Sequence, residues 1–326
     1  MKVAVLNYSE MYNLACHKIA SYHEQLGDQV VMAAGADLFC LDCQKAYLSA
    51  LFTHDLPDLV RDANLLADRG IEVEIGGPAV TFLADWVEGE CGIKPHLGLD
   101  ERFEKVPGSY LWTFSSRGCP RSCPFCLVSA LEGTKIIEDG EFVPAPNLGD
   151  SNLLMTSWRH QQKVVEKLKP LGLVDINSGF DCRIFAQDCQ IYYGLYSQLN
   201  LKMWRFAFDT AEQEGYIRKI FQFLRGHGLD RHQVQAYVLC NFPGISPEEV
   251  VYRAKVVIGY GMMPYLMRYQ PVDSVDRHYV APGWTEELVN SLIAYYNYPR
   301  VWMSCSWEER LRSRGKNRLW LVTHAR

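Results

Sequence analysis

The 326-residue sequence lacks the features that mark several specialised classes of protein. It has no apolar run of the roughly 18 residues needed to span a bilayer, no internal repeat and no long linker. Its composition, 48% hydrophobic and 22% charged, argues against a disordered or low-complexity chain. Its net charge of −5 argues against a generally basic, nucleic-acid-coating protein. What remains is an ordinary globular chain, long enough for one large domain or for a small domain joined to a medium one.

The start of the sequence does not show the pattern expected of a secretory signal peptide. The first apolar stretch is interrupted by Asn7, Ser9 and Glu10, which indicates a buried first strand rather than a signal peptide. We therefore expect a cytoplasmic protein without membrane contact. In that compartment the 11 cysteines favour metal or redox chemistry over a disulfide framework.

Strand and helix patterns alternate along the first 95 residues. Such alternation indicates a small parallel α/β sheet. The expected strands are 2–8, 29–33, 46–52 and 71–75, and the expected helices are 13–25 and 57–69.

A second series of alternation begins near residue 110. It predicts six strands with crossover helices, as in an open or partial β/α barrel whose chemistry lies at the carboxyl ends of the strands. The expected strands are 110–114, 152–155, 174–176, 203–208, 233–239 and 264–269, with helices near 157–169, 187–198, 211–226 and 246–259. We expect an α/β fold with domains at 1–100, 101–281 and a helical or mixed cap at 282–326.

The most informative motif is a cysteine triplet directly after the first barrel strand. Cys119, Cys123 and Cys126 have C-x3-C-x2-C spacing in a loop rich in Gly, Pro and Ser. Three thiolates leave a cubane iron–sulfur cluster one ligand short of the usual four, so that one iron can bind a substrate or cosubstrate. A structural zinc site is the alternative, but zinc spacings usually include a second Cys or His pair.

This triplet, with Phe125 directly before its last cysteine, resembles the signature of the radical S-adenosylmethionine (radical SAM) superfamily. The resemblance covers about 105–275 and implies a partial (β/α)6 barrel. It also implies that Cys119, Cys123 and Cys126 hold a [4Fe-4S] cluster whose fourth iron chelates SAM. Reductive cleavage would then give a 5′-deoxyadenosyl radical for C–H activation. Such an enzyme is oxygen-sensitive and takes its electron from a donor such as flavodoxin or ferredoxin.

Polar residues near the other strand ends are the candidate cofactor contacts. The superfamily's glycine-glycine-glutamate turn is absent, and Asp150 or Asn152 is its expected substitute. Ionised side chains are costly to bury unpaired, so Asp209 and Arg268 contact SAM or form structural ion pairs, with each other or with Arg205 and Asp181. The candidate cofactor-binding residues are Phe125, Asp150, Asn152, Asn177, Asp209 and Arg268.

Candidates for auxiliary chemistry are weaker. Cys182, Cys240 and Tyr269 lie near predicted strand ends and are the candidate catalytic residues, although a free cysteine is more often a small buried hydrophobe. Cys40 and Cys43 have metal or redox spacing, but no second pair accompanies them.

The N-terminal sheet resembles the flavodoxin-like cobalamin-binding domain of cobalamin-dependent radical SAM proteins, shortened by about one β/α unit. The resemblance rests on residues 13–15 and on the glycine pair Gly76 and Gly77, which would permit close approach to a large ligand. No D-x-H-x-x-G signature is present. Two interpretations therefore remain open. The sheet binds cobalamin, which would allow methyl transfer, or it keeps its fold but has lost the cofactor site.

The last 28 residues combine seven Lys or Arg with Trp302, Trp307 and Trp320. Such a segment can bind phosphates and stack bases, or it can be a solvated helix that covers apolar surface. The leading hypothesis is thus that the protein is a radical SAM enzyme whose substrate is unidentified, a nucleotide being one candidate. The alternative is a non-enzymatic protein with a structural or redox-sensing cluster that binds nucleic acid through this tail.

Overall fold

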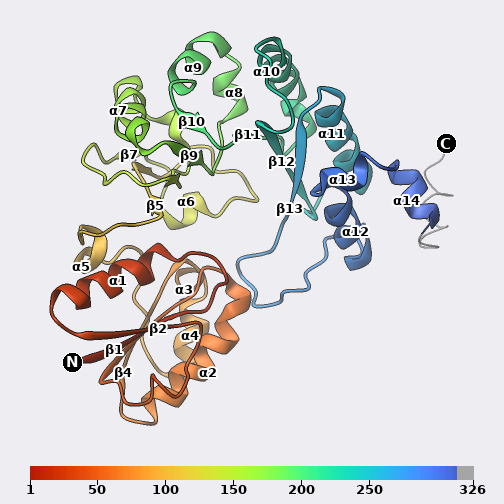
Figure 1. Ribbon diagram of the computed structural model, residues 1–326. Coiled ribbons are helices and arrows are strands. Elements are labelled where there is room, and N and C mark those ends of the chain that lie inside the picture. The colour runs from red at the N-terminus through yellow and green to blue at the C-terminus, as the bar shows by residue number, and fades with distance from the viewer. Residues whose placement is uncertain (314–326) are drawn as a thin grey trace. The chain divides into compact units, whose positions relative to one another are not determined.

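The computed structural model describes residues 1–313, and the chain forms two compact units (Figure 1). The first comprises residues 1–178, 194–201 and 270–279, and the second comprises residues 179–193, 202–269 and those from 280 onward. The α/β class with parallel sheets is confirmed. The domain boundaries near 100 and 281 stay a prediction.

The first unit opens with a four-stranded parallel sheet of order β2-β1-β3-β4. Its strands are short and apolar, and helices cover both faces of the sheet (Figure 1). The elements are β1 (Lys2–Asn7), α1 (Leu14–Gln25), β2 (Gln29–Ala33), β3 (Lys45–Ser49), η1 (Thr53–Asp55), α2 (Leu56–Ala67), β4 (Glu72–Gly76), α3 (Pro78–Phe82), α4 (Ala84–Cys91) and α5 (Glu101–Glu104).

Alternation along the strands explains the two cores of this sheet. Val3 and Val5 face α1 and α5, whereas Ala4 and Leu6 face α2, α3 and α4. All four side chains are fully buried. The strands and helices expected in the first 95 residues are confirmed, with ends that differ by at most three residues.

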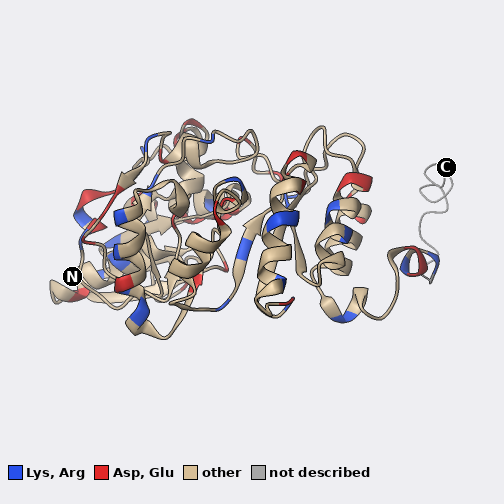
Figure 2. Cartoon of the chain, turned by 90° about the horizontal axis from the view of Figure 1, so that it is seen from above, with Lys and Arg blue, Asp and Glu red and all other residues tan. Residues whose placement is uncertain are grey.

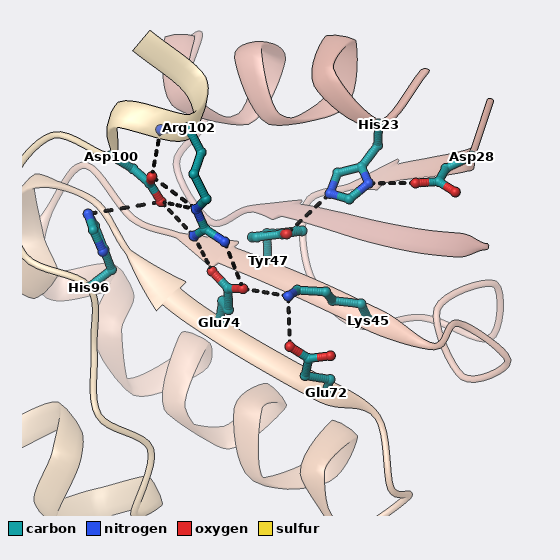
Figure 3. A network of polar contacts seen from close by, with 9 residues as sticks. All are labelled: His23, Asp28, Lys45, Tyr47, Glu72, Glu74, His96, Asp100 and Arg102. Carbon is teal, nitrogen blue, oxygen red and sulfur yellow. Dashed lines mark hydrogen bonds and ion pairs between the residues drawn. The ribbon is translucent and has the colours of Figure 1, made fainter. Parts of the chain in front are cut away.

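A network of charged residues ties the segment that follows this sheet back onto it (Figure 3). The Arg102 guanidinium donates to both Glu74 on β4 and Asp100, and the Lys45 ammonium on β3 bridges Glu72 and Glu74. Beneath this network Phe103 is buried. The segment is therefore held to the sheet by the buried Phe103 ring and by the ion pairs of Arg102.

The rest of the first unit carries very short strands in the order β10-β9-β8-β5, and a two-stranded ribbon of β6 and β7. The elements are β5 (Trp112–Thr113), β6 (Ser116–Arg117), α6 (Val128–Leu131), β7 (Ile137–Glu138), β8 (Asn147–Leu148), η2 (Leu153–Met155), α7 (Trp158–Leu168), η3 (Lys169–Leu171), β9 (Leu173–Ile176) and β10 (Asn200–Leu201).

One expected strand is wrong. Residues 152–155 form a 3₁₀ turn, η2, and the strand of this position is β8, five residues earlier. Asn147 and Leu148 pair with β5 on one side and β9 on the other. The strand cannot extend further, because Gly149 approaches the Phe114 ring and Asp150 turns toward the amides of Ser115 and Ser116.

The second unit contains the parallel sheet β11-β12-β13 with helices on it. Its elements are β11 (Trp204–Ala207), η4 (Ala211–Gln213), α10 (Glu214–Gly226), β12 (Val234–Cys240), α11 (Pro247–Gly259), β13 (Met263–Arg268), α12 (Glu286–Tyr296), α13 (Pro299–Trp302) and α14 (Trp307–Ser313), with α8 (Cys182–Phe185) and α9 (Cys189–Tyr196) before β10. The three strands and the helices α9, α10 and α11 occur where the sequence predicts them, whereas the sequence does not locate α8, α12, α13 or α14 individually. Among the described residues, no helix is both long and apolar enough to cross a membrane.

Candidate functional site

The cysteine loop begins where β6 ends and runs into α6. Cys119 is buried, Cys123 is half-buried and Cys126 is exposed. The Cys126 amide donates to the Cys123 carbonyl at 2.9 Å, which closes a tight turn between the last two cysteines. Within residues 1–313, no three His, Cys, Asp or Glu side chains are gathered as a metal site. The three cysteines all come from one short loop, residues 119–126.

Gly118 is required by the geometry at the base of this loop. Its φ is +86°, and a Cβ there would lie 2.2 Å from the Lys135 carbonyl oxygen. No side chain fits that space, so the backbone enters the loop against the β6–β7 ribbon. The neighbouring Cys119 amide donates to the Gly133 carbonyl at 3.1 Å.

Asp150 organises the backbone immediately before the loop. Its carboxylate is buried and accepts from the amides of Ser115, at 2.6 Å, and Ser116, at 3.1 Å, and from both hydroxyls. His160 reaches the Ser115 hydroxyl at 3.0 Å. Burial raises the pKa of the Asp150 carboxyl, while the bonds from the two serines oppose that rise.

Asn152 and Asn177 follow the neighbouring strands of the same unit. The Asn152 amide nitrogen lies 3.7 Å from the Cys119 sulfur, as a donor to it. Asn177 follows β9 and donates its backbone amide to the Leu148 carbonyl at 3.1 Å. The structure therefore brings Asn152 to the cysteine loop, and it places Phe125 half-buried within that loop.

Glu132 contacts the base of the cysteine loop, although the sequence analysis did not identify it as a candidate. One of its oxygens accepts from the Arg117 guanidinium at 2.8 Å, and the other accepts from the Gly118 amide at 2.8 Å and the Ser151 hydroxyl at 2.7 Å. The same guanidinium stacks on the Phe114 ring at 3.5 Å. A single Glu six residues after Cys126 forms no recognisable motif, so only the fold reveals this set of contacts.

The remaining candidates lie in the second unit, at the carboxyl edge of its sheet. Cys240 and Arg268 are register partners at the ends of β12 and β13. The Tyr269 amide donates to the Cys240 carbonyl at 2.9 Å, and Asp209 follows β11. The sheet thus brings Asp209, Cys240, Arg268 and Tyr269 to one edge, as the alternation predicts.

The ionisation of these groups follows from burial. Burial raises the pKa of the Asp209 carboxyl to about 6, against the opposing effect of Arg253 and Arg183. It also raises the pKa of the Cys182 and Cys240 thiols to about 12, so both are neutral at neutral pH. Asp181 forms an ion pair with Arg183, with 3.0 Å between the Arg183 Nε and a carboxylate oxygen of Asp181.

Arg253 is a second residue that the sequence did not single out. It is fully buried on α11, and its guanidinium donates to the carbonyls of Phe208, at 2.6 Å, and Leu239, at 3.0 Å. These carbonyls lie near the ends of adjacent strands, so Arg253 fixes the edge that carries Asp209 and Cys240.

The residues of the cobalamin resemblance meet at one edge of the N-terminal sheet. In the order β2-β1-β3-β4 the topology switches between β1 and β3, which is where such sheets bind ligands. There Asn13 is buried and donates to the Ser49 hydroxyl at 3.0 Å. Gly77 has a φ of +106°, and a Cβ on it would lie 2.7 Å from that hydroxyl oxygen. Small and polar residues therefore line the switch point, where Asn13 hydrogen-bonds to Ser49 and Gly77 packs against it.

The Cys40 and Cys43 pair lies before β3, away from that edge. Both side chains are buried, and the Cys40 thiol donates to Asp37 at 3.2 Å. Burial raises the pKa of the Cys40 thiol to about 11. The pair is thus part of a folded loop with a protonated thiol, which is the ordinary-loop interpretation.

The described part of the C-terminal tail buries one of its two tryptophans. Trp307 on α14 is buried against the rings of Tyr295 and Tyr296. Figure 2 shows both acidic and basic residues on this last described helix, and Glu308 pairs with Lys255 at 2.9 Å. Trp320 and the last four basic residues, Arg314, Lys316, Arg318 and Arg326, lie outside the described residues.

Comparisons with known proteins identify the fold. No protein-family model matches the sequence, and no curated protein is significantly similar to it. A solved structure of the radical SAM methyltransferase TsrM from Kitasatospora setae, with cobalamin and a [4Fe-4S] cluster bound, is similar with a TM-score of 0.57. The match has 11% identity and covers 83% of this chain and 77% of that one.

A second structure of the same enzyme holds tryptophan substrate and the SAM analogue aza-SAM. It is similar with a TM-score of 0.58 and 10% identity, over 81% of this chain and 72% of that one. At such identity the likeness shows the fold alone. The chain therefore has an α/β fold similar to that of a cobalamin-bound radical SAM methyltransferase.

Proposed function

We propose that this protein is a radical SAM enzyme. The cysteine triplet carries the proposal: its three thiols lie in a loop that begins at a strand end and is anchored at its base by Gly118, Asp150 and Glu132. The similarity of the fold to radical SAM methyltransferases supports it. Three soft thiolate ligands from one segment suit an iron–sulfur cluster, and they leave one of its four irons without a protein ligand.

The chain's own residues have defined tasks in this proposal. Cys119, Cys123 and Cys126 hold the [4Fe-4S] cluster, and Asn152 orients the Cys119 sulfur. Bound and reduced, such a cluster would supply the electron for reductive cleavage of SAM, the chemistry that would allow hydrogen abstraction from a substrate C–H bond. Phe125, Asn152, Asn177, Asp209 and Arg268 are the candidate contacts to SAM, Asp150 supports the loop, and Cys182, Cys240 and Tyr269 remain the auxiliary candidates.

The surroundings of the enzyme follow from the same proposal. No disulfide joins cysteines within residues 1–313, which suits a reducing, cytoplasmic setting and an oxygen-sensitive cluster. A one-electron donor such as flavodoxin or ferredoxin would reduce the cluster.

The experiment is SAM cleavage after anaerobic reconstitution with iron and sulfide. With dithionite, the wild type should convert SAM to 5′-deoxyadenosine. Cys126→Ala should abolish product while keeping the far-UV circular dichroism, and Cys91→Ala, on α4, should behave as the wild type. Zinc in place of iron, or no cleavage by the wild type, would overturn the proposal and favour a structural metal.

Cobalamin decides the reaction class within this proposal. The similar enzyme binds cobalamin, and small polar residues line the switch point of the N-terminal sheet here, which supports methyl transfer. Equilibrium dialysis against hydroxocobalamin tests it, with Ser49→Leu to block the edge and Ser109→Leu, on an exposed stretch, as control. Binding lost only in Ser49→Leu supports a cobalamin enzyme. Cleavage of SAM without any cobalamin binding leaves a cobalamin-free hydrogen-abstracting enzyme.

A further inference from the structure

The three contacts of Glu132 share one chemical property: every partner donates. The Arg117 guanidinium, the Gly118 amide and the Ser151 hydroxyl all point hydrogens at the two carboxylate oxygens, at 2.7–2.8 Å. An ionised carboxylate is an acceptor without hydrogens, so it satisfies all three at once. A glutamine of the same shape has one acceptor oxygen and an NH₂ group, which would face a donor. The site is therefore built for a carboxylate.

These contacts join segments that are distant in the sequence. Gly118 lies at the start of the cysteine loop, and Glu132 lies at its end, directly after α6. Ser151 comes from the turn after β8, next to Asn152, whose side chain reaches the Cys119 sulfur. One carboxylate thus closes the loop at its base and fixes its register against the 150–152 segment.

We propose that Glu132 is a positioning residue that sets the cysteine loop against the 150–152 segment, and so aligns the cluster with bound SAM. This inference rests on the proposed function for its last step. The closing of the loop itself is a property of the protein without metal, and it can be measured separately.

The test compares Glu132→Gln with Glu141→Gln. Glu141 is an exposed carboxylate that binds Lys163 at 2.8 Å, so it is a matched control outside the loop. In the metal-free protein, amide hydrogen exchange of residues 118–126 should be at least tenfold faster in Glu132→Gln than in the control. After reconstitution, iron retained against a chelator should fall roughly tenfold, as for other residues that orient metal ligands. The KM for SAM should rise severalfold with a smaller change in kcat.

Ser151→Ala provides a second, milder variant. It removes one donor and leaves the carboxylate with Arg117 and Gly118, so its exchange and its KM should lie between those of the wild type and Glu132→Gln. Equal exchange and equal iron retention in Glu132→Gln and Glu141→Gln would overturn the inference. A wild type that never cleaves SAM would overturn the proposed function instead, and the exchange comparison would still decide whether Glu132 closes the loop.

Discussion

At the scale of single residues, the base of the cysteine loop depends on backbone geometry that the cysteines do not reveal. Gly118 and Gly133 both have positive φ, at +86° and +82°, but only Gly118 faces another group within contact distance. Alanine substitutions at these two glycines therefore distinguish two losses of folding free energy, one from a left-handed backbone alone and one from an added steric clash.

Gly133→Ala should lower the free energy of unfolding by about 1 kcal/mol, because a left-handed alanine is strained. Gly118→Ala should cost about 2 kcal/mol more, because its Cβ would meet the Lys135 carbonyl oxygen. Urea unfolding of the two variants measures the difference. Equal losses would mean that the Lys135 carbonyl moves aside at little cost.

Asp209 gives a prediction for the dependence of stability on pH. Burial raises its pKa to about 6, above the roughly 3.9 expected in the unfolded chain. The folded state therefore binds the proton more tightly, so this residue's contribution to stability is fully present below about pH 4 and is lost as the pH rises through about 6.

Asp209→Asn removes that pH-dependent loss. Its melting temperature should exceed that of the wild type at pH 7.5, and the difference should shrink as the pH falls through 6 toward about 4. Asp58→Asn, at an exposed position on α2, should show no such convergence. A gain for Asp209→Asn that stays constant from pH 5 to pH 8 would contradict the shifted pKa.

At the scale of elements, the N-terminal sheet is held to the segment after it by a mixed apolar and polar contact. Phe103 on α5 packs on the rings of Tyr22 and Tyr47, and the Arg102 fork lies over it with Glu74 and Asp100 (Figure 3). Because the Arg102 side chain is 45% exposed, its ion pairs contribute modestly and are screened by salt.

Arg102→Ala should therefore lower the free energy of unfolding by about 1 kcal/mol in dilute buffer. The loss should shrink in 1 M salt, since the wild-type ion pairs are then screened. Arg300→Ala, at an exposed position on α13, serves as control and should change nothing. A loss for Arg102→Ala that salt does not alter would point to its packing on Phe103 instead.

At the scale of the whole molecule, the units are assembled from segments that are separate in the sequence. Residues 194–201 and 270–279 return to the first unit after the chain has entered the second. Within the first unit, the Thr53 hydroxyl donates to the Ser274 carbonyl at 2.6 Å, across 221 residues of sequence. The fold therefore rests on the protein's own long-range contacts, and the cysteine loop is one short segment of it.

Removal of the proposed cluster should then leave the molecule folded. Chelation of iron from the reconstituted protein should bleach its visible absorbance, while the far-UV circular dichroism stays unchanged. The melting temperature should shift by only a few degrees, unlike that of domains that fold only around a metal. Unfolding upon chelation would favour a structural cluster over an enzymatic one.

Local patterns in the sequence sufficed for the longer elements. Alternating apolar runs located the four strands of the N-terminal sheet, the strands β9, β11, β12 and β13, and the helices α1, α2, α7, α9, α10 and α11. The spacing of Cys119, Cys123 and Cys126 pointed to the chemistry. Local patterns suffice there because strand periodicity, capping and ligand spacing involve neighbours in the sequence.

Only the tertiary structure decided the contacts between distant segments. The two-residue strand β8 forms because β5 and β9 pair with it, and nothing in Asn147 or Leu148 signals that. Glu132 and Arg253 acquire their roles from donors and carbonyls supplied by other elements. A charged side chain carries no sequence period of its own, so its partners are known only once the backbone has brought them together.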